Sequence, residues 1–196
     1  MFTGIITNIG IIKTLEFGSD RDCLLEIELD KEMSRGFDIG CSIACNGICL
    51  TLVKKEGLKL SFEASKETCN VTTLSDWSIG QKVNIEFALR LGDEFGGHIV
   101  SGHVDGVVKL TKLEKVQDSW KMRFGLLECE DLMKFIAKKG SVCINGVSLT
   151  VNEVSEGGFE VNIISHTLKN TILGGLVVGS DVNLEVDLLA RCVLKG

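Results

Sequence analysis

The sequence contains an internal duplication, and this feature limits the possible folds more than any other. Three blocks of the first half return in the second half at one constant spacing: Cys45–Leu52 (CNGICLTL) as Ile144–Val151 (INGVSLTV), Gly80–Glu86 as Gly179–Glu185, and Glu67-Thr68 as His166-Thr167. Thr3–Ile6 pairs with Ser101–Val104 at a spacing one residue shorter, a change that a loop can absorb. A period of about a hundred residues is far longer than the repeats of solenoids, so we expect each copy to be an independent domain.

We place the domain boundary in the glycine-containing stretch Leu91–Gly97, which gives domains at 1–96 and 97–196. Within each copy, short β-branched segments alternate with Gly, Asn and Asp, a pattern typical of strands. In the first copy these segments are Ile9–Leu15, Leu24–Leu29, Ser42–Ala44 and Val83–Leu89. In Val182–Asp187 every second residue is apolar, so one face of that strand should be buried and the other solvated.

The dipeptides Asn46-Gly47 and Asn145-Gly146 each separate two apolar segments. Both residue types adopt positive φ at low cost, so each pair can close a tight hairpin, and a turn explains the Asn without assigning it a function. Helix signals are sparse: Asp131–Lys139 has helical spacing with basic residues late, and its counterpart is Lys31–Phe37. Many short strands with few helices favour a small closed barrel, because closure removes exposed sheet edges. We therefore predict an all-β fold with two barrels in tandem.

Composition argues against several classes of partner and compartment. A net charge of −6 disfavours binding to nucleic acid or to an anionic membrane, because these partners require clustered Lys and Arg. No apolar run reaches the roughly 18 to 20 residues that a membrane-spanning helix needs. The start Met1–Ile6 lacks the features of a signal peptide, so we expect the eight cysteines to be free thiols in the cytoplasm.

Cys41, Cys45 and Cys49 recur at intervals of four, but they do not predict a metal site. Zinc sites favour closely paired ligands with a second matching pair, and the second copy has Gly, Ile and Ser at these positions. We expect no metal, and we interpret Cys41 and Cys45 as packing residues. The sequence also lacks a phosphate-binding Gly-Lys-Ser/Thr loop, a Gly-x-Ser-x-Gly elbow and a dinucleotide fingerprint, which disfavours ATP-dependent and serine-hydrolase functions.

Two differences between the copies mark candidate reactive side chains. Cys49 is exchanged for Ser148, which reflects either two chemical environments or two small residues at the start of a buried strand. His103 falls where the first copy has Ile5, in the small-residue setting Ser-Gly-His. This histidine is either a proton carrier or an ordinary hydrogen-bonded side chain.

Four motifs together resemble those of riboflavin synthases: Met1–Ile6 (MFTGII), Asn46–Thr51 (NGICLT), Ser101–His103 (SGH) and Asn145–Thr150 (NGVSLT). They occur in the right order and in both halves, which makes the resemblance more specific than any single motif. It implies two similar six-stranded Greek-key barrels with a few short helices. It also implies a transferase of riboflavin biosynthesis without metal or redox cofactor. In this reaction two molecules of 6,7-dimethyl-8-ribityllumazine exchange a four-carbon unit, giving riboflavin and 5-amino-6-(ribitylamino)pyrimidinedione.

The resemblance also implies two substrate-binding sets and a group of residues near the chemistry. The first-barrel pocket would use Gly4, Ile5, Ile6, Cys49, Leu50, Thr51, Glu63, Ala64, Ser65, Lys66, Glu67 and Thr68. The second-barrel pocket would use Gly102, His103, Val104, Lys139, Ser148, Leu149, Thr150, Asn162, Ile163, Ile164, Ser165, His166 and Thr167. The catalytic candidates would be Phe2, Ser42, Cys49, His103, Ser148, Thr150 and Asp187.

Among these candidates we assign acid–base work to His103 and Ser148. The C7 methyl group of lumazine is acidic because the ring delocalises the carbanion, so modest polar groups suffice to remove its proton. Cys49, or a water that it positions, would add to the second lumazine and activate it for attack. Asn145 departs from the acidic residue that some family members carry there, so we assign no carboxylate role to this position.

The resemblance further implies a homotrimer in which the first barrel of one subunit meets the second barrel of another. Two lumazines would then lie face to face between them. Association with lumazine synthase is a further implied partnership. Family members usually continue past the second barrel into a helix that helps to hold the trimer, whereas this chain ends at Gly196, soon after Asp187. We therefore expect a weaker or differently packed trimer.

Two alternative functions remain open at the level of sequence. The first is a non-catalytic antenna protein that holds lumazine or flavin in the same duplicated barrels, against which Cys49, His103, Ser148 and Lys139 favour the enzyme. The second is a tandem oligonucleotide-binding barrel, which the acidity and the 6% of aromatic residues disfavour.

Overall fold

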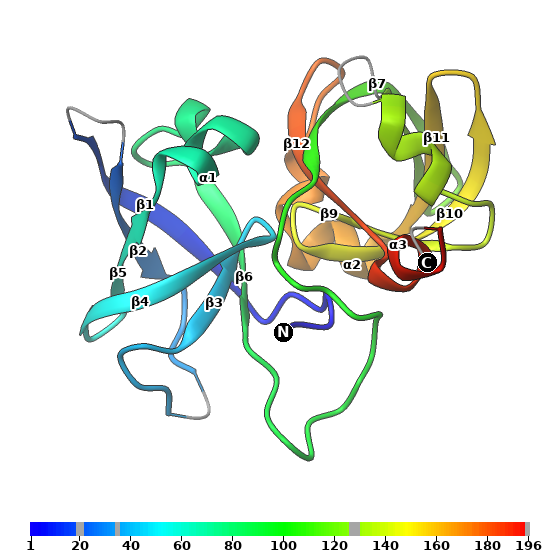
Figure 1. The fold of residues 1–196 in the computed structure, drawn as a ribbon. Helices are drawn as coiled ribbons and strands as arrows, with labels where there is room; N and C mark the ends of the chain where they lie inside the picture. Colours follow the sequence, from blue (N-terminus) through cyan, green and yellow to red (C-terminus); the bar gives the residue numbers. More distant parts are fainter. Residues whose placement is uncertain (19–21, 34–35, 126–129, 195–196) are drawn as a thin grey trace.

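A computed structural model shows two β-barrels side by side, and it describes residues 1–18, 22–33, 36–125 and 130–194 (Figure 1). The strands of the first barrel are β1 (Asn8–Phe17), β2 (Cys23–Leu29), β3 (Ser42–Cys45), β4 (Ile48–Glu56), β5 (Lys59–Ala64) and β6 (Lys82–Phe87). Helix α1 (Lys66–Val71) and the 3-10 helix η1 (Thr73–Asp76) lie between β5 and β6. The strands close into one antiparallel sheet in the order β1-β2-β5-β4-β3-β6. Since β3, β4 and β5 are joined by hairpins and β2 lies beside β5, the topology is a Greek key.

The second barrel repeats this order of elements. Its strands are β7 (Gly106–Val116), β8 (Ser119–Gly125), β9 (Ser141–Ile144), β10 (Val147–Ser155), β11 (Gly158–Ile164) and β12 (Asp181–Val186). Its helices are η2 (Glu130–Phe135), α2 (Ser165–Asn170), η3 (Ile172–Gly175) and the C-terminal α3 (Leu188–Leu194). The sheet is again closed, in the order β10-β11-β8-β7-β12-β9. Among the described residues, no helix is long and apolar enough to cross a membrane.

The predicted fold class is confirmed, and so are the predicted strands of the first copy, with small shifts at their ends. β6 ends at Phe87 rather than at Leu89. The helix predicted at Asp131–Lys139 is a 3-10 helix that ends at Phe135. Its predicted counterpart at Lys31–Phe37 is wrong, since residues 31–33 and 36–37 are not helical. That stretch contains a glycine, which costs about 1 kcal/mol in a helix, and it is far shorter than a helix needs to be stable without packing.

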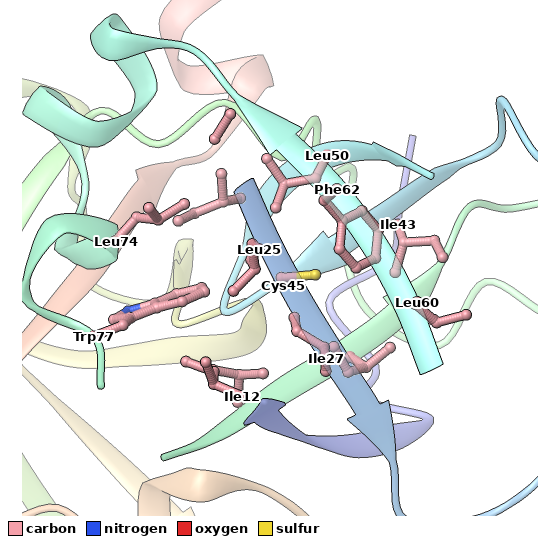
Figure 2. Packing of buried hydrophobic residues seen from close by; sticks show 14 of the residues in the cluster. Ile12, Leu25, Ile27, Ile43, Cys45, Leu50, Leu60, Phe62, Leu74 and Trp77 are labelled. Carbon is pink, nitrogen blue, oxygen red and sulfur yellow. The ribbon is translucent and has the colours of Figure 1, made fainter. Parts of the chain in front are cut away.

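Each barrel is filled by its own apolar core. In the first barrel, Leu25, Ile27, Leu60 and Phe62 are fully buried and point into the interior (Figure 2). Cys45 lies in this core and Cys41 packs against it, as their interpretation as packing residues predicts. All of the buried residues of each core come from one copy of the duplicated sequence, so each copy supplies most of the burial that its own barrel needs.

The join between the barrels is made by buried amides in a reciprocal arrangement. The side-chain amide of Asn84 in β6 donates to the carbonyl oxygen of Asn145 at 2.9 Å, and that of Asn183 in β12 donates to the carbonyl oxygen of Asn46 at 2.9 Å. Asn84 and Asn183 are 0% and 1% exposed. Buried amides require partners of this kind, so the two hydrogen bonds fix how one barrel sits on the other.

The two predicted Asn-Gly turns are confirmed, and they meet at this join. Asn46 and Asn145 have φ of 47° and 45°, and the glycines that follow have φ of 80° and 81°. A Cβ on Gly47 would lie 2.7 Å from the backbone nitrogen of Gly146, so the turns lie in direct contact. A turn therefore accounts for both Asn-Gly pairs, with the added task of seating the barrels together.

Candidate active site

The segments that precede β1 and β7 each cross to the opposite barrel. In β10, the backbone nitrogen of Ser148 donates to the carbonyl oxygen of Gly4 at 2.8 Å. In β4, the backbone nitrogen of Cys49 donates to the carbonyl oxygen of Gly102, also at 2.8 Å. The start of each repeat is thus bound next to the candidate nucleophile of the other repeat.

Apolar side chains of the same two segments also pack against the opposite barrel. Ile6 packs against the core of the second barrel, and Val104 packs against the core of the first. Each segment therefore lies between the barrels: Gly4 and Ile6 contact the second barrel, and Gly102 and Val104 contact the first. The expected division of the substrate-binding residues into two pockets stays a prediction.

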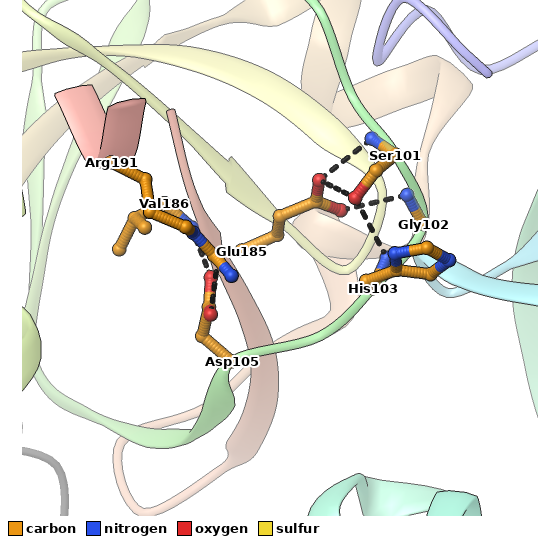
Figure 3. Close-up of polar contacts among 7 residues, drawn as sticks. All are labelled: Ser101, Gly102, His103, Asp105, Glu185, Val186 and Arg191. Atoms are coloured by element: carbon orange, nitrogen blue, oxygen red, sulfur yellow. Dashed lines mark hydrogen bonds and ion pairs between the residues drawn. The ribbon is translucent and has the colours of Figure 1, made fainter. Parts of the chain in front are cut away.

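Glu185 of β12 holds the segment that carries His103 (Figure 3). Its Oε1 accepts hydrogen bonds from the backbone nitrogen of Ser101 at 2.7 Å and from the Ser101 hydroxyl at 2.6 Å, and its Oε2 accepts one from the backbone nitrogen of Gly102 at 2.9 Å. The backbone nitrogen of His103 donates to the Ser101 Oγ at 3.2 Å. Four hydrogen bonds thus fix the backbone from which the imidazole projects.

Glu86 of β6 holds the other leading segment in the same way. Its carboxylate accepts hydrogen bonds from Thr3 N at 2.7 Å, Thr3 Oγ1 at 2.9 Å and Gly4 N at 2.9 Å. Burial raises the pKa of both Glu86 and Glu185, while the hydrogen bonds they accept favour the charged form and oppose that rise. Neither glutamate was predicted as a functional residue from the sequence, although both close a repeated block.

On the first-barrel side of the site, the segment that carries His103 contacts Cys49 through Gly102. Cys49 is half-buried in β4, opposite Ala44 of β3, and His103 is exposed. The backbone at Gly102 lies so close to β4 that a Cβ there would be 2.5 Å from the Cys49 Cβ. The histidine-bearing segment therefore lies directly on the strand that carries the thiol.

The second-barrel side holds a pair that the sequence analysis missed. Nδ1 of His98 lies 2.7 Å from the Ser148 Oγ, and His98 is only 9% exposed. Gly97 permits this approach, because a Cβ there would lie 2.0 Å from the Thr3 carbonyl oxygen and 3.0 Å from the Ser148 Cβ. The sequence did contain a pattern that could have indicated His98, because it follows two glycines and so has small neighbours, as His103 has.

The surroundings of His98 favour its neutral form. Burial lowers the pKa of His98, and the negative charge of Asp187 opposes this shift. A neutral imidazole can accept the Ser148 proton at Nδ1 or donate its own, which suits it to proton exchange with the hydroxyl. Asp187, one of the expected catalytic residues, is half-buried after β12, where its Oδ1 accepts the backbone N–H of Leu189 at 2.9 Å.

The lowered pKa of His98 predicts a pH dependence of stability. The unfolded chain binds a proton at His98 near the ordinary pKa of 6.5, whereas the folded chain binds it only at lower pH. The free energy of unfolding should therefore fall as the pH drops from about 6.5 through the lowered pKa. His98→Gln should reduce this fall in thermal melts across that window, and His166→Gln, at an exposed side chain, should leave it unchanged. Equal slopes in wild type and His98→Gln would contradict the assignment.

The remaining catalytic candidates lie in different settings. Phe2 is 0% exposed and packs with Val100 in a small cluster between the barrels, so it supports the join. Ser42 of β3 pairs with Thr51 of β4. Thr150 is the counterpart of Thr51 in the second barrel, where it pairs with Ser141. Thr51 and Thr150 are exposed.

Lys139 is exposed and has a φ of 71°, where the first copy has Gly40 with a φ of 92°. A left-handed backbone costs a non-glycine residue about 1 to 2 kcal/mol, so Lys139 lowers the free energy of unfolding relative to a glycine at this position.

The expected binding stretches lie at matched ends of the two barrels. Glu63–Thr68 runs from the end of β5 into α1, and Asn162–Thr167 runs from the end of β11 into α2. Cys49 lies in β4, which pairs with β5, and Ser148 lies in β10, which pairs with β11. Each stretch therefore lies at the end of the strand next to the one that carries Cys49 or Ser148. A hollow of about 600 Å³ is lined by Phe17, Cys23, Leu24 and the stretch 63–65, among others. Of the expected first-barrel binding residues, only Glu63, Ala64 and Ser65 line this hollow, and Cys49 and His103 do not.

Comparisons with known proteins agree with the duplication. The family described as Lumazine binding domain matches residues 3–88 and 101–187. Riboflavin synthase of Brucella abortus (strain 2308) is 43% identical, over 97% of this chain and 95% of the relative. Riboflavin synthase of Escherichia coli (strain K12) is 36% identical, over 99% of this chain and 90% of the relative. The crystal structure of LumP complexed with 6,7-dimethyl-8-(1'-D-ribityl) lumazine is similar, with a TM-score of 0.83, 29% identity and coverage of 95% of this chain and 99% of LumP.

Proposed function

The chain belongs to the riboflavin synthase family of lumazine-binding enzymes, and from that premise we propose that it catalyses the dismutation of 6,7-dimethyl-8-ribityllumazine. One molecule gives up a four-carbon unit and leaves as 5-amino-6-(ribitylamino)pyrimidinedione, and the other gains the unit and becomes riboflavin. The two products together contain the atoms of the two substrates, so the reaction needs no external oxidant or reductant. We propose that it proceeds without a metal or redox cofactor.

The observation that carries this proposal is the division of reactive side chains between matched positions of the two barrels. The first-barrel side offers Cys49 with His103, and the second-barrel side offers Ser148 with His98 at 2.7 Å. Two copies of one substrate fit two related pockets, and different side chains in them give the two molecules different fates. Holding both reactants in place removes the entropic cost of their encounter.

We assign the steps to these side chains as follows. On the second barrel, the Ser148 hydroxyl, paired with the neutral imidazole of His98, exchanges the proton of the C7 methyl group of one lumazine. On the first barrel, Cys49 or a water that it positions adds to the other lumazine, and the methyl carbanion then attacks the activated ring. The added thiol or water is expelled again, and the two C–N bonds that join the four-carbon unit to the donor molecule break, so that the two nitrogens of the donor become the amino groups of the pyrimidinedione. His103 exchanges protons with the intermediates on that side. Phe2, Glu86 and Glu185 support the backbone around these groups.

We further propose that the reacting pockets meet between subunits of a homotrimer in the cytoplasm, with the first barrel of one subunit against the second barrel of the next. Association with lumazine synthase stays a prediction of the family resemblance. Sedimentation in dilute buffer tests the assembly. A protein that is monomeric and yet fully active would contradict a shared site.

The second candidate function is a lumazine-holding antenna, and the likeness to LumP favours it. Both functions predict lumazine binding, so binding alone does not separate them. The exposed His103 and the Ser148–His98 pair favour the enzyme, because holding a chromophore does not require proton exchange.

Riboflavin fluorescence separates the two functions. Purified protein incubated with 6,7-dimethyl-8-ribityllumazine, without added cofactor, should produce riboflavin over many turnovers. A matched sample of heat-denatured protein controls for spontaneous conversion. Stable lumazine binding with no riboflavin formed would overturn the enzymatic proposal and leave the antenna function.

A further inference from the structure

The end of β12 holds the histidine-bearing segment 101–105 at both of its ends (Figure 3). Glu185 binds the start of the segment, as described above. At the other end, the backbone nitrogen of Asp105 donates to the carbonyl oxygen of Leu184 at 2.8 Å. The Oδ2 of Asp105 also accepts a hydrogen bond from the backbone nitrogen of Val186 at 2.9 Å. His103 lies between these two anchors, so the position of its backbone depends on both.

Helix α3 adds a further contact through Arg191. The Nη2 of Arg191 forms an ion pair with the Oδ1 of Asp105, and the two side chains are 34% and 12% exposed, respectively. A charge-assisted hydrogen bond in such a sheltered setting is stronger than an ion pair on the open surface. The backbone nitrogen of Arg191 donates to the Asp187 carbonyl oxygen at 3.1 Å, which is the first i→i−4 hydrogen bond of α3, so the helix begins directly after β12.

The first repeat has the same backbone anchors without the ion pair. Thr7 stands in the place of Asp105, and its backbone nitrogen and hydroxyl both donate to the carbonyl oxygen of Ile85, at 3.0 and 3.3 Å. Thr7 is uncharged and cannot pair with an arginine. The segment that it ends carries Ile5 where the second repeat carries His103. The additional contact therefore accompanies the histidine.

We propose that Asp105 and Arg191 are positioning residues for His103, and that α3 fixes the imidazole against the first barrel. This role rests on the proposed function, in which His103 exchanges protons with substrate. The guanidinium holds one carboxylate oxygen of Asp105 while the other oxygen holds the end of β12. The backbone nitrogen of Asp105 already ties the segment to β12, and the ion pair adds a side-chain link that fixes the Asp105 carboxylate between Val186 and Arg191.

Steady-state kinetics of variants that replace either charged side chain by an uncharged one test the proposal. Arg191→Met and Asp105→Asn should each lower kcat roughly tenfold, the rate equivalent of one charge-assisted hydrogen bond, with little change in KM for lumazine. Arg191→Lys should recover part of the loss. Lys109→Met removes another ion pair of the same barrel, with Asp181 at 2.6 Å, and should keep the wild-type kcat. Equal kcat in wild type and Arg191→Met would overturn the proposal.

Histidine NMR signals keep this test separate from the enzymatic proposal. The chain has three histidines, so the imidazole signals can be assigned with single substitutions. In the ligand-free protein, Arg191→Met should shift or broaden the His103 signal and leave the His166 signal in place. If wild type forms no riboflavin but these signals change as expected, the proposed function fails and the positioning role stands. If kcat of Arg191→Met recovers fully at protein concentrations that restore assembly, α3 acts through assembly and the positioning role is refuted.

Discussion

Gly102→Ala is expected to abolish turnover and to lower the free energy of unfolding by about 3 to 5 kcal/mol. Gly102 has a φ of 81°, and a Cβ there would lie 2.5 Å from the Cys49 Cβ and 3.0 Å from a ring carbon of Phe2. Neither contact is at the end of a flexible side chain, so the segment would have to move off β4. That movement would break the hydrogen bond between Cys49 N and Gly102 O and displace His103. Urea denaturation and the riboflavin assay measure the two effects.

Gly80→Ala is the matched control for this experiment. Gly80 has a similar φ of 88°, but a Cβ there would have no heavy atom within 4 Å. The control variant therefore carries the backbone strain of about 1 to 2 kcal/mol without the collision, and it should remain active. If Gly102→Ala unfolds at the same urea concentration as Gly80→Ala, the close approach to β4 contributes nothing to stability.

His103→Gln and Ser148→Ala are each expected to slow single-turnover conversion by about 100-fold or more, the usual effect of losing an acid–base group. Glutamine keeps much of the size and hydrogen bonding of histidine, and alanine removes only the serine hydroxyl. Lumazine affinity, measured by fluorescence titration, should therefore stay close to wild type. An unchanged rate in either variant would remove that side chain from the mechanism.

Mixing the two slowed variants, His103→Gln and Ser148→Ala, tests whether the segments that precede β1 and β7 cross to the opposite barrel. His103 lies on the first barrel and Ser148 on the second, so a shared site takes them from different subunits. After random reassembly, about a quarter of the shared sites would carry both native side chains, and activity should return. If both side chains instead belonged to one barrel, as sequence position alone suggests, every mixed site would lack one of them. No recovery after verified subunit exchange would contradict the crossed arrangement.

The fold was predictable because each copy carries its own pattern of strands and turns. The Asn-Gly pairs closed tight turns as expected, since positive φ is a local property of these residues. The helix at Lys31–Phe37 was wrongly predicted by analogy with the second copy, because a short helix depends on packing that a sequence pattern does not report.

The site was predictable only in part, for two physical reasons. Placing Gly102 on β4 depends on a contact between residues far apart in sequence, which the duplication does not reveal. His98 was missed because its importance comes from the Ser148 hydroxyl 2.7 Å away, and the first repeat offers no histidine for comparison. The motif residues of the two pockets were named from resemblance, and their individual roles stay predictions.

The crossed leading segments have a consequence for how two copies of one gene can diverge. At the crossing points, Gly4, Cys49, Gly102 and Ser148 contribute only main-chain atoms to the hydrogen bonds. The side chains at Cys49 and Ser148, and at the residues that follow Gly4 and Gly102, can therefore acquire new chemistry without loosening the attachment of the halves. The thiol of Cys49 in place of the Ser148 hydroxyl, and the side chain of Ile5 in place of the His103 imidazole, are differences of this kind. A scaffold that began with equivalent sides could in this way give its two occupants separate tasks while keeping its symmetry.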